Sequence, residues 1–154
     1  MASELSPCFL CPRGCGVNRL QGETGFCGAG ALMRVAKMAP HHWEEPCISG
    51  VRGSGTVFFS GCNLRCVYCQ NEAISWQVRG RELTSAQLAQ GFLGLQEQGV
   101  HNINLVTAAP YVPLVVEALA IACDLGLNLP VVYNSSGYES VETLRLLAGH
   151  VDVY

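Results

Sequence analysis

The feature that most constrains this chain is its nine cysteines in 154 residues. Seven of them fall into two groups, Cys8, Cys11, Cys15 and Cys27 near the start and Cys62, Cys66 and Cys69 further on, while Cys47 and Cys123 stand alone. An odd total fits poorly with a closed disulfide framework, and no export signal precedes the first group. We therefore expect the two groups to bind metal in a reducing compartment, and the two isolated cysteines to be small buried residues.

The composition predicts one globular domain, because 49% of the residues are hydrophobic, 14% are charged and the net charge is −3. The basic residues are scattered, so we expect neither nucleic acid nor an anionic membrane as a partner. The longest apolar runs, residues 114–122 and 144–148, are too short to cross a bilayer, and the first four residues lack the features of a signal peptide. A cytoplasmic location is the resulting expectation.

The composition and the pattern of apolar residues change near residues 50–55. Residues 1–50 are rich in Cys, Gly and Pro and predict a loop-rich, Cys-rich segment, in which His41 to Glu45 are expected to form a solvated linker. Residues 51–154 alternate short apolar runs with helical patterns, which is typical of βα units on a parallel sheet. We therefore predict two parts, a metal-binding segment at 1–50 and an α/β fold at 51–154.

The second part predicts three βα units and the beginning of a fourth strand. Strands are expected at residues 56–60, 103–107 and 129–134, helices at 85–98, 113–125 and 140–148, and a further strand from Val151 to Tyr154. The first helix has a capping box in Thr84 and Gln87. Because a closed barrel needs more units than these, we expect a partial (β/α) barrel, the N-terminal portion of a longer fold.

The second cysteine group is the best candidate for chemistry. Cys62, Cys66 and Cys69 follow the first predicted strand directly, where the loops of parallel α/β folds carry active sites. Their spacing lets three thiolates of one loop converge, and no fourth ligand lies nearby, so a bound iron–sulfur cluster would keep one iron open. The alternative is a structural zinc loop that takes its fourth ligand from Cys47, His41 or His42.

The x3/x2 spacing of these cysteines, with Tyr68 just before the last, resembles the radical S-adenosylmethionine (radical SAM) superfamily. The resemblance implies that Cys62, Cys66 and Cys69 hold a [4Fe-4S] cluster whose fourth iron binds S-adenosylmethionine. It also implies reductive cleavage to a 5′-deoxyadenosyl radical with an electron from a donor, and a position for Tyr68 near the adenine.

The surrounding residues, 44–50, 53–71, 131–138 and 151–154, resemble the branch related to pyruvate formate-lyase-activating enzyme. This resemblance implies hydrogen abstraction from a protein or peptide partner, as in glycyl-radical activation. Where the family commonly has a Gly-Gly-Glu type motif that contacts the methionine amino group, residues 106–110 differ, and Thr107 is the candidate. Asn134, Ser135 and Ser136 are the candidates for contacts with the methionine carboxylate or the ribose.

The first cysteine group supplies four thiolates, a complete ligand set for a second metal, either zinc or an iron–sulfur cluster. Neighbouring prolines and glycines permit the tight turns that metal knuckles need. A merely structural or redox-labile segment is the alternative for Cys8, Cys11, Cys15 and Cys27. For the whole chain, the rival to a radical enzyme is a metal-binding interaction module without catalysis.

Overall fold

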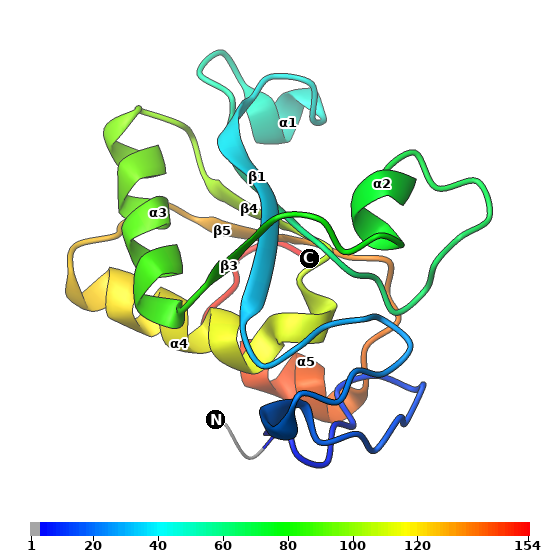
Figure 1. Cartoon of the computed structure of the whole chain (residues 1–154). Coiled ribbons are helices and arrows are strands. Elements are labelled where there is room, and N and C mark those ends of the chain that lie inside the picture. The colour runs from blue at the N-terminus through cyan, green and yellow to red at the C-terminus, as the bar shows by residue number, and fades with distance from the viewer. Residues whose placement is uncertain (1–3) are drawn as a thin grey trace.

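The computed structural model describes residues 4–154 and shows a mixed α/β fold built on a five-stranded sheet (Figure 1). Residues 1–3, part of the stretch judged to lack a signal peptide, lie outside the described residues. The strand order is β3-β1-β2-β4-β5. The strands are β1 (Met33–His41), β2 (Ser54–Phe59), β3 (Arg81–Leu83), β4 (Ile103–Val106) and β5 (Val131–Asn134). The helices are α1 (Pro46–Ser49), α2 (Glu72–Ser75), α3 (Ser85–Glu97), α4 (Val112–Asp124) and α5 (Val141–Leu147), with short 3-10 turns η2 (Arg19–Gln21) and η3 (Ala109–Tyr111).

The parallel half of the sheet agrees with the prediction. β2 pairs in parallel with β4, and β4 with β5, and these strands lie within a few residues of the expected ranges. Helix α3 begins at Ser85 because Thr84 and Gln87 form the expected capping box. Helix α4 has Pro113 in its first turn, where the missing N–H costs nothing.

Where a fourth strand was expected, the structure has a single β-bridge to β5. Val153 forms an isolated parallel bridge with Val132, and the Tyr133 N–H donates to the Val153 carbonyl at 2.8 Å. The Asp152 carboxylate accepts a hydrogen bond from the Val131 N–H at 2.8 Å, which holds this end of the chain beside β5.

The other half of the sheet corrects the sequence interpretation. Residues 33–41, expected to belong to a loop-rich segment, form β1, which pairs antiparallel with β2 on one side and β3 on the other. The sheet therefore continues across residues 50–55. At Gly55 the backbone of β2 packs closely against the residues before β4, because a Cβ on Gly55 would lie 2.7 Å from the Asn102 carbonyl oxygen.

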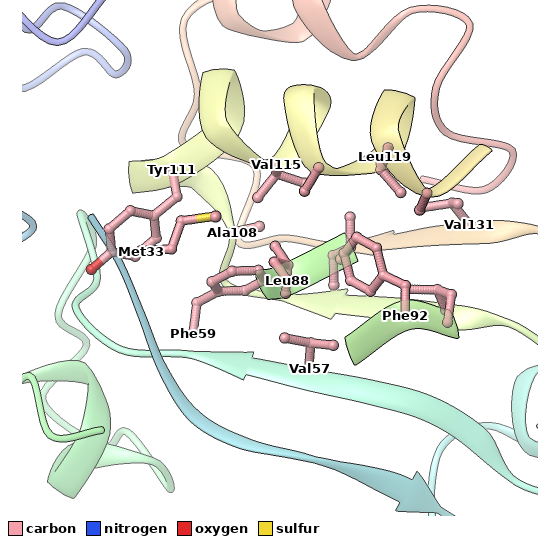
Figure 2. Close-up of a cluster of buried hydrophobic side chains, with 14 of the residues drawn as sticks. Met33, Val57, Phe59, Leu88, Phe92, Ala108, Tyr111, Val115, Leu119 and Val131 are labelled. Carbon is pink, nitrogen blue, oxygen red and sulfur yellow. The ribbon is translucent and has the colours of Figure 1, made fainter. Parts of the chain in front are cut away.

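The hydrophobic core lies between the sheet and helices α3 and α4 (Figure 2). Val57 and Phe59 of β2 point toward Leu88 and Phe92 of α3. Helix α4 adds side chains such as Leu119 to the same cluster. Successive strand residues point to opposite faces. Helices therefore cover one face, while polar residues such as Asn104 belong to the other.

The cysteine-rich stretch that precedes β1 lies beside α5 (Figure 1), and among its described residues only the last part, Cys27 and Ala29, reaches the core. The Leu10 carbonyl accepts hydrogen bonds from the Ser140 N–H at 3.3 Å and the Thr143 hydroxyl at 2.8 Å. Within residues 4–154, no helix is both long enough and apolar enough to cross a lipid bilayer.

Candidate active site and metal ligands

The three-cysteine loop begins two residues after β2 ends, at the carboxyl end of a parallel strand. Gly61 makes the turn with a φ of +84°, and a Cβ there would lie 2.6 Å from the Cys27 carbonyl oxygen. Arg65 also has a positive φ of 54°, which bends the loop between Cys62 and Cys66. The backbone thus turns sharply just before Cys62 and again just before Cys66.

The three thiols are half-buried. The Leu64 N–H donates to Cys62 Sγ at 3.4 Å, and Cys69 Sγ lies 3.3 Å from the Ser75 hydroxyl of α2. As they stand, no three Cys, His, Asp or Glu side chains within residues 4–154 are arranged so that they could hold a metal ion. The loop supplies ligands whose side chains would have to converge on binding.

Two buried polar atoms in this loop lack a hydrogen-bond partner in the described structure, Asn63 Oδ1 and Arg65 Nε. Buried polar atoms without partners are rare in folded proteins, so these two mark a place where a polar group is missing. The donor set of three soft thiols on one loop, with orphaned polar atoms between them, fits an iron–sulfur cluster with one exchangeable position.

The other candidates lie on the neighbouring strand ends. Thr107 follows β4 directly and Asn134 ends β5, and the Thr107 N–H donates to the Asn134 carbonyl at 3.1 Å. Thr107 has a φ of +61°, which is unusual for a β-branched residue. Backbone strain of this kind is concentrated at functional sites. Ser135 and Ser136 continue from Asn134 and are exposed, so all four lie along the same edge of the sheet as the cysteine loop.

One hydrogen bond ties the cysteine loop to this second group. The Asn63 side-chain amide donates to the Tyr138 carbonyl at 2.5 Å. Tyr68, the last of the candidates, is 83% exposed at the outer end of the cysteine loop, with Val67 beside it. The structure therefore brings the loops after β2 and β5 into contact and leaves Tyr68 free to meet a ligand.

A cavity of about 410 Å³ lies on the face of the sheet that α3 and α4 do not cover. Asn134 and Ser135 line it, and so do three glutamates, Glu44, Glu45 and Glu139. The Tyr133 hydroxyl donates to Glu139 at 3.1 Å, and burial together with the Glu139 charge raises the pKa of Tyr133 well above its usual range. The cavity is therefore lined by acidic side chains, with a protonated phenol beside the Glu139 carboxylate.

Sequence reasoning missed the residues that tertiary structure brings in. Asn104 lines the cavity, and neither of its side-chain polar atoms has a hydrogen-bond partner among residues 4–154. A polar residue within the apolar stretch of β4 was the available signal. Glu44 and Glu45, expected in a solvated linker, also line the cavity, and Glu45 is exposed as expected. Cys47 and Cys123 are exposed, which overturns the expectation that they are buried.

The N-terminal cysteines gather around a separate place. Cys8, Cys11, Cys15 and Cys27 line one small cavity, together with Arg13 and Arg19. Burial raises the pKa of the Cys27 thiol. The Arg19 guanidinium lies over the Tyr111 ring, 5.5 Å from the centre of that ring. Burial raises the pKa of the Tyr111 phenol to about 12.

Comparison with known proteins matches the βα region to a superfamily and nearly the whole chain to one relative. The sequence pattern of the radical SAM superfamily matches residues 56–154, which include most of β2, the cysteine loop, β4 and β5. An uncharacterised protein of Methanocaldococcus jannaschii is 33% identical over 153 residues, which cover 96% of this chain and 44% of that relative. The chain therefore spans less than half the length of the relative, and the similarity reaches into the N-terminal segment beyond the superfamily match.

Proposed function

Because this chain belongs to the radical SAM superfamily, we propose that Cys62, Cys66 and Cys69 hold a [4Fe-4S] cluster and that S-adenosylmethionine binds beside it. When bound, the cluster and S-adenosylmethionine would supply the 5′-deoxyadenosyl radical after one electron arrives from a donor protein. The observation that carries the proposal is the cysteine loop at the carboxyl end of β2, on the same sheet edge as Thr107 and Asn134.

The residues of the second group would bind and orient the cofactor. Asn134 and Ser135 line the cavity and offer an amide and a hydroxyl for the methionine carboxylate or the ribose. Ser136 adds a further hydroxyl on the same exposed turn, and Thr107 is the candidate for the amino group. Tyr68 offers an exposed ring against which adenine could stack.

Charge supports the same assignment. S-adenosylmethionine carries a sulfonium and an ammonium group, and the cavity presents the carboxylates of Glu44, Glu45 and Glu139. A volume of about 410 Å³ lies within the range typical of small-molecule sites. A cavity that combines these carboxylates with Asn134 and Ser135 is complementary to a cationic cofactor.

The substrate of the proposed reaction is a protein or peptide, as in the pyruvate formate-lyase-activating branch. This inference rests on the similarity of residues 44–50, 53–71 and 131–138 to that branch. The overall fold of the full protein would be a (β/α) barrel whose first strands are β2, β4 and β5. Electron donor and peptide partner are both expected to approach the sheet edge that carries the cysteine loop.

Anaerobic reconstitution with iron and sulfide tests the cofactor assignment. We expect broad visible absorption, a paramagnetic signal after dithionite reduction that changes when S-adenosylmethionine is added, and release of 5′-deoxyadenosine. Cys66→Ala should abolish all three, while Cys123→Ala, an exposed thiol on α4, should keep them. A colourless reconstituted protein would refute the proposal.

The substrate class has its own test. With peptides deuterated at a glycine Cα, deuterium should appear in 5′-deoxyadenosine by mass spectrometry. Deuterium found only when the solvent is labelled would contradict hydrogen abstraction from a peptide glycine.

A further inference from the structure

The four N-terminal cysteines line one small cavity. Its free space is about 20 Å³, roughly that of a single water-sized sphere. Cys8, Cys11, Cys15 and Cys27 all line it. Four thiols are the complete ligand set of a single tetrahedral ion. Their side chains would have to converge as the ion binds, because no three of them are arranged to hold it as they stand in the described part of the chain.

A buried cation beside this cavity has no acidic partner. The Arg19 side chain is 1% exposed and lines the cavity. Its guanidinium donates to the Gly30 carbonyl at 2.9 Å and the Pro110 carbonyl at 2.6 Å, and Nη1 lies 3.9 Å from Cys8 Sγ. Within residues 4–154, none of its hydrogen bonds goes to a carboxylate. Buried charges are normally paired, so the structure calls for an anion at the sulfur side of Arg19.

A metal–thiolate complex, which is negatively charged as a whole, would supply that anion. Four thiolates around a divalent ion carry two excess negative charges, and the cavity is lined by two guanidinium groups, those of Arg13 and Arg19. The thiol protons would be released to solvent as the sulfur lone pairs bind the ion. The charge of the closed site would then be balanced by residues already in place.

The local backbone suits such a site. The Phe26 N–H donates to Cys15 Sγ at 3.5 Å, and a Cβ on Gly25 would lie 2.8 Å from the same sulfur. The Cys8 N–H donates to the Val17 carbonyl at 3.0 Å, which closes the turn that carries Cys11 and Cys15. These contacts hold the backbone around the cavity before any ion binds.

We propose that Cys8, Cys11, Cys15 and Cys27 bind a single zinc ion in a closed tetrahedral site whose charge is balanced by Arg13 and Arg19. Zinc accepts four thiolates in this geometry, and a closed set with no open position is structural. The site lies outside residues 56–154, the part matched by the superfamily pattern.

The zinc site would also order the three-cysteine loop. Arg13 Nε donates to the Asn63 carbonyl at 3.0 Å, and its guanidinium lies 3.8 Å from the centre of the Phe26 ring. Arg65 lies over the same ring at 5.0 Å. Phe26 precedes Cys27, so the ion would fix a side chain that contacts arginines of both cysteine groups.

Metal analysis of the full chain, purified without oxygen and with both iron and zinc supplied, tests the proposal. The triple variant Cys62→Ala/Cys66→Ala/Cys69→Ala should retain about one zinc and no iron per chain. Cys11→Ser/Cys15→Ser should lose that zinc at least tenfold. Cys47→Ser/Cys123→Ser, which removes two exposed thiols outside the cavity, should keep it.

Iron in place of zinc in the triple variant, or unchanged zinc in Cys11→Ser/Cys15→Ser, would overturn the site. Cobalt provides a second readout that needs no N-terminal variant. In the triple variant, cobalt should give the sulfur-to-cobalt absorption and strong tetrahedral bands of four thiolate ligands, and bands typical of octahedral cobalt would overturn the proposal. Because both readouts use a protein without the [4Fe-4S] ligands, their outcome is independent of the radical function.

Discussion

The N-terminal segment and the βα region are held by different forces. Among residues 4–32, Leu5, Leu10 and Ala29 are the buried apolar side chains, and the principal long-range contacts are polar, from Arg13 and Arg19 to backbone carbonyls. The βα region instead buries a continuous apolar cluster between its sheet and α3 and α4. Apolar burial scales with area and tolerates changes at the surface, whereas a few buried polar contacts depend on every partner being present.

This difference predicts that the two regions respond separately to perturbation. A change in the core should weaken the whole molecule, since the sheet and helices share one cluster. A change in the N-terminal contacts should loosen that segment and the cysteine loop it touches, with less effect on β4 and α4. The following three variants test this separation.

The largest effect is expected for Phe92→Ala. Phe92 is fully buried between α3 and the sheet, and removing a buried aromatic ring typically costs about 3–5 kcal/mol. Urea unfolding should show this loss, with hydrogen exchange rising in α3, α4 and β4 together. Leu93→Ala, a neighbour only partly buried, is the control and should cost clearly less. Equal losses would contradict a core centred on Phe92.

Arg19→Met should have an intermediate and local effect. The change leaves the Gly30 and Pro110 carbonyls without the donor they have now, at a cost of about 2 kcal/mol. Hydrogen exchange should rise in residues 8–30 and the start of α4, while β4 amides stay protected. Arg145→Met, an exposed arginine on α5, should change neither. Faster exchange throughout the sheet would show that the two regions are not separable.

Thr107→Gly should have the smallest effect, and of opposite sign. A left-handed β-branched residue is strained by about 1–2 kcal/mol. Glycine relieves this strain but adds unfolded-state entropy, so we expect a net gain below about 1 kcal/mol in urea unfolding. The variant also tests the site. If Thr107 contacts the methionine amino group through its side chain, binding of S-adenosylmethionine should weaken although stability rises; unchanged binding would remove Thr107 from the site.

The sequence predicted the elements whose signals are local. The start of α3 follows from Thr84 and Gln87, and the parallel strands are short apolar runs between glycines and helices. β1 was missed because its alternation is weak and its pairing with β2 and β3 is formed by residues distant in sequence. β3 has only three residues, two of them exposed, so no pattern could reveal it.

The candidate site shows the same limit. The cysteine spacing is visible in eight consecutive residues, so candidate ligands could be named from the sequence, and their binding of a cluster stays a prediction. The roles of Asn63, Arg19 and Asn104 depend on which carbonyls, thiols and cavities the fold places next to them, and no sequence pattern carries that information. The environment of Cys47 and Cys123 was predicted from residue type alone and was wrong, because burial is a property of position.

The antiparallel placement of β1 gives the sheet a direction. On one side β2 is already paired with a strand of opposite polarity, and beyond it lies only the three-residue β3. On the other side β5 presents a strand of the same polarity as β2 and β4, and Val153 has begun to pair there. A further strand of the βα type would therefore continue the parallel run at β5, whereas the opposite flank of the sheet ends in the short antiparallel β3.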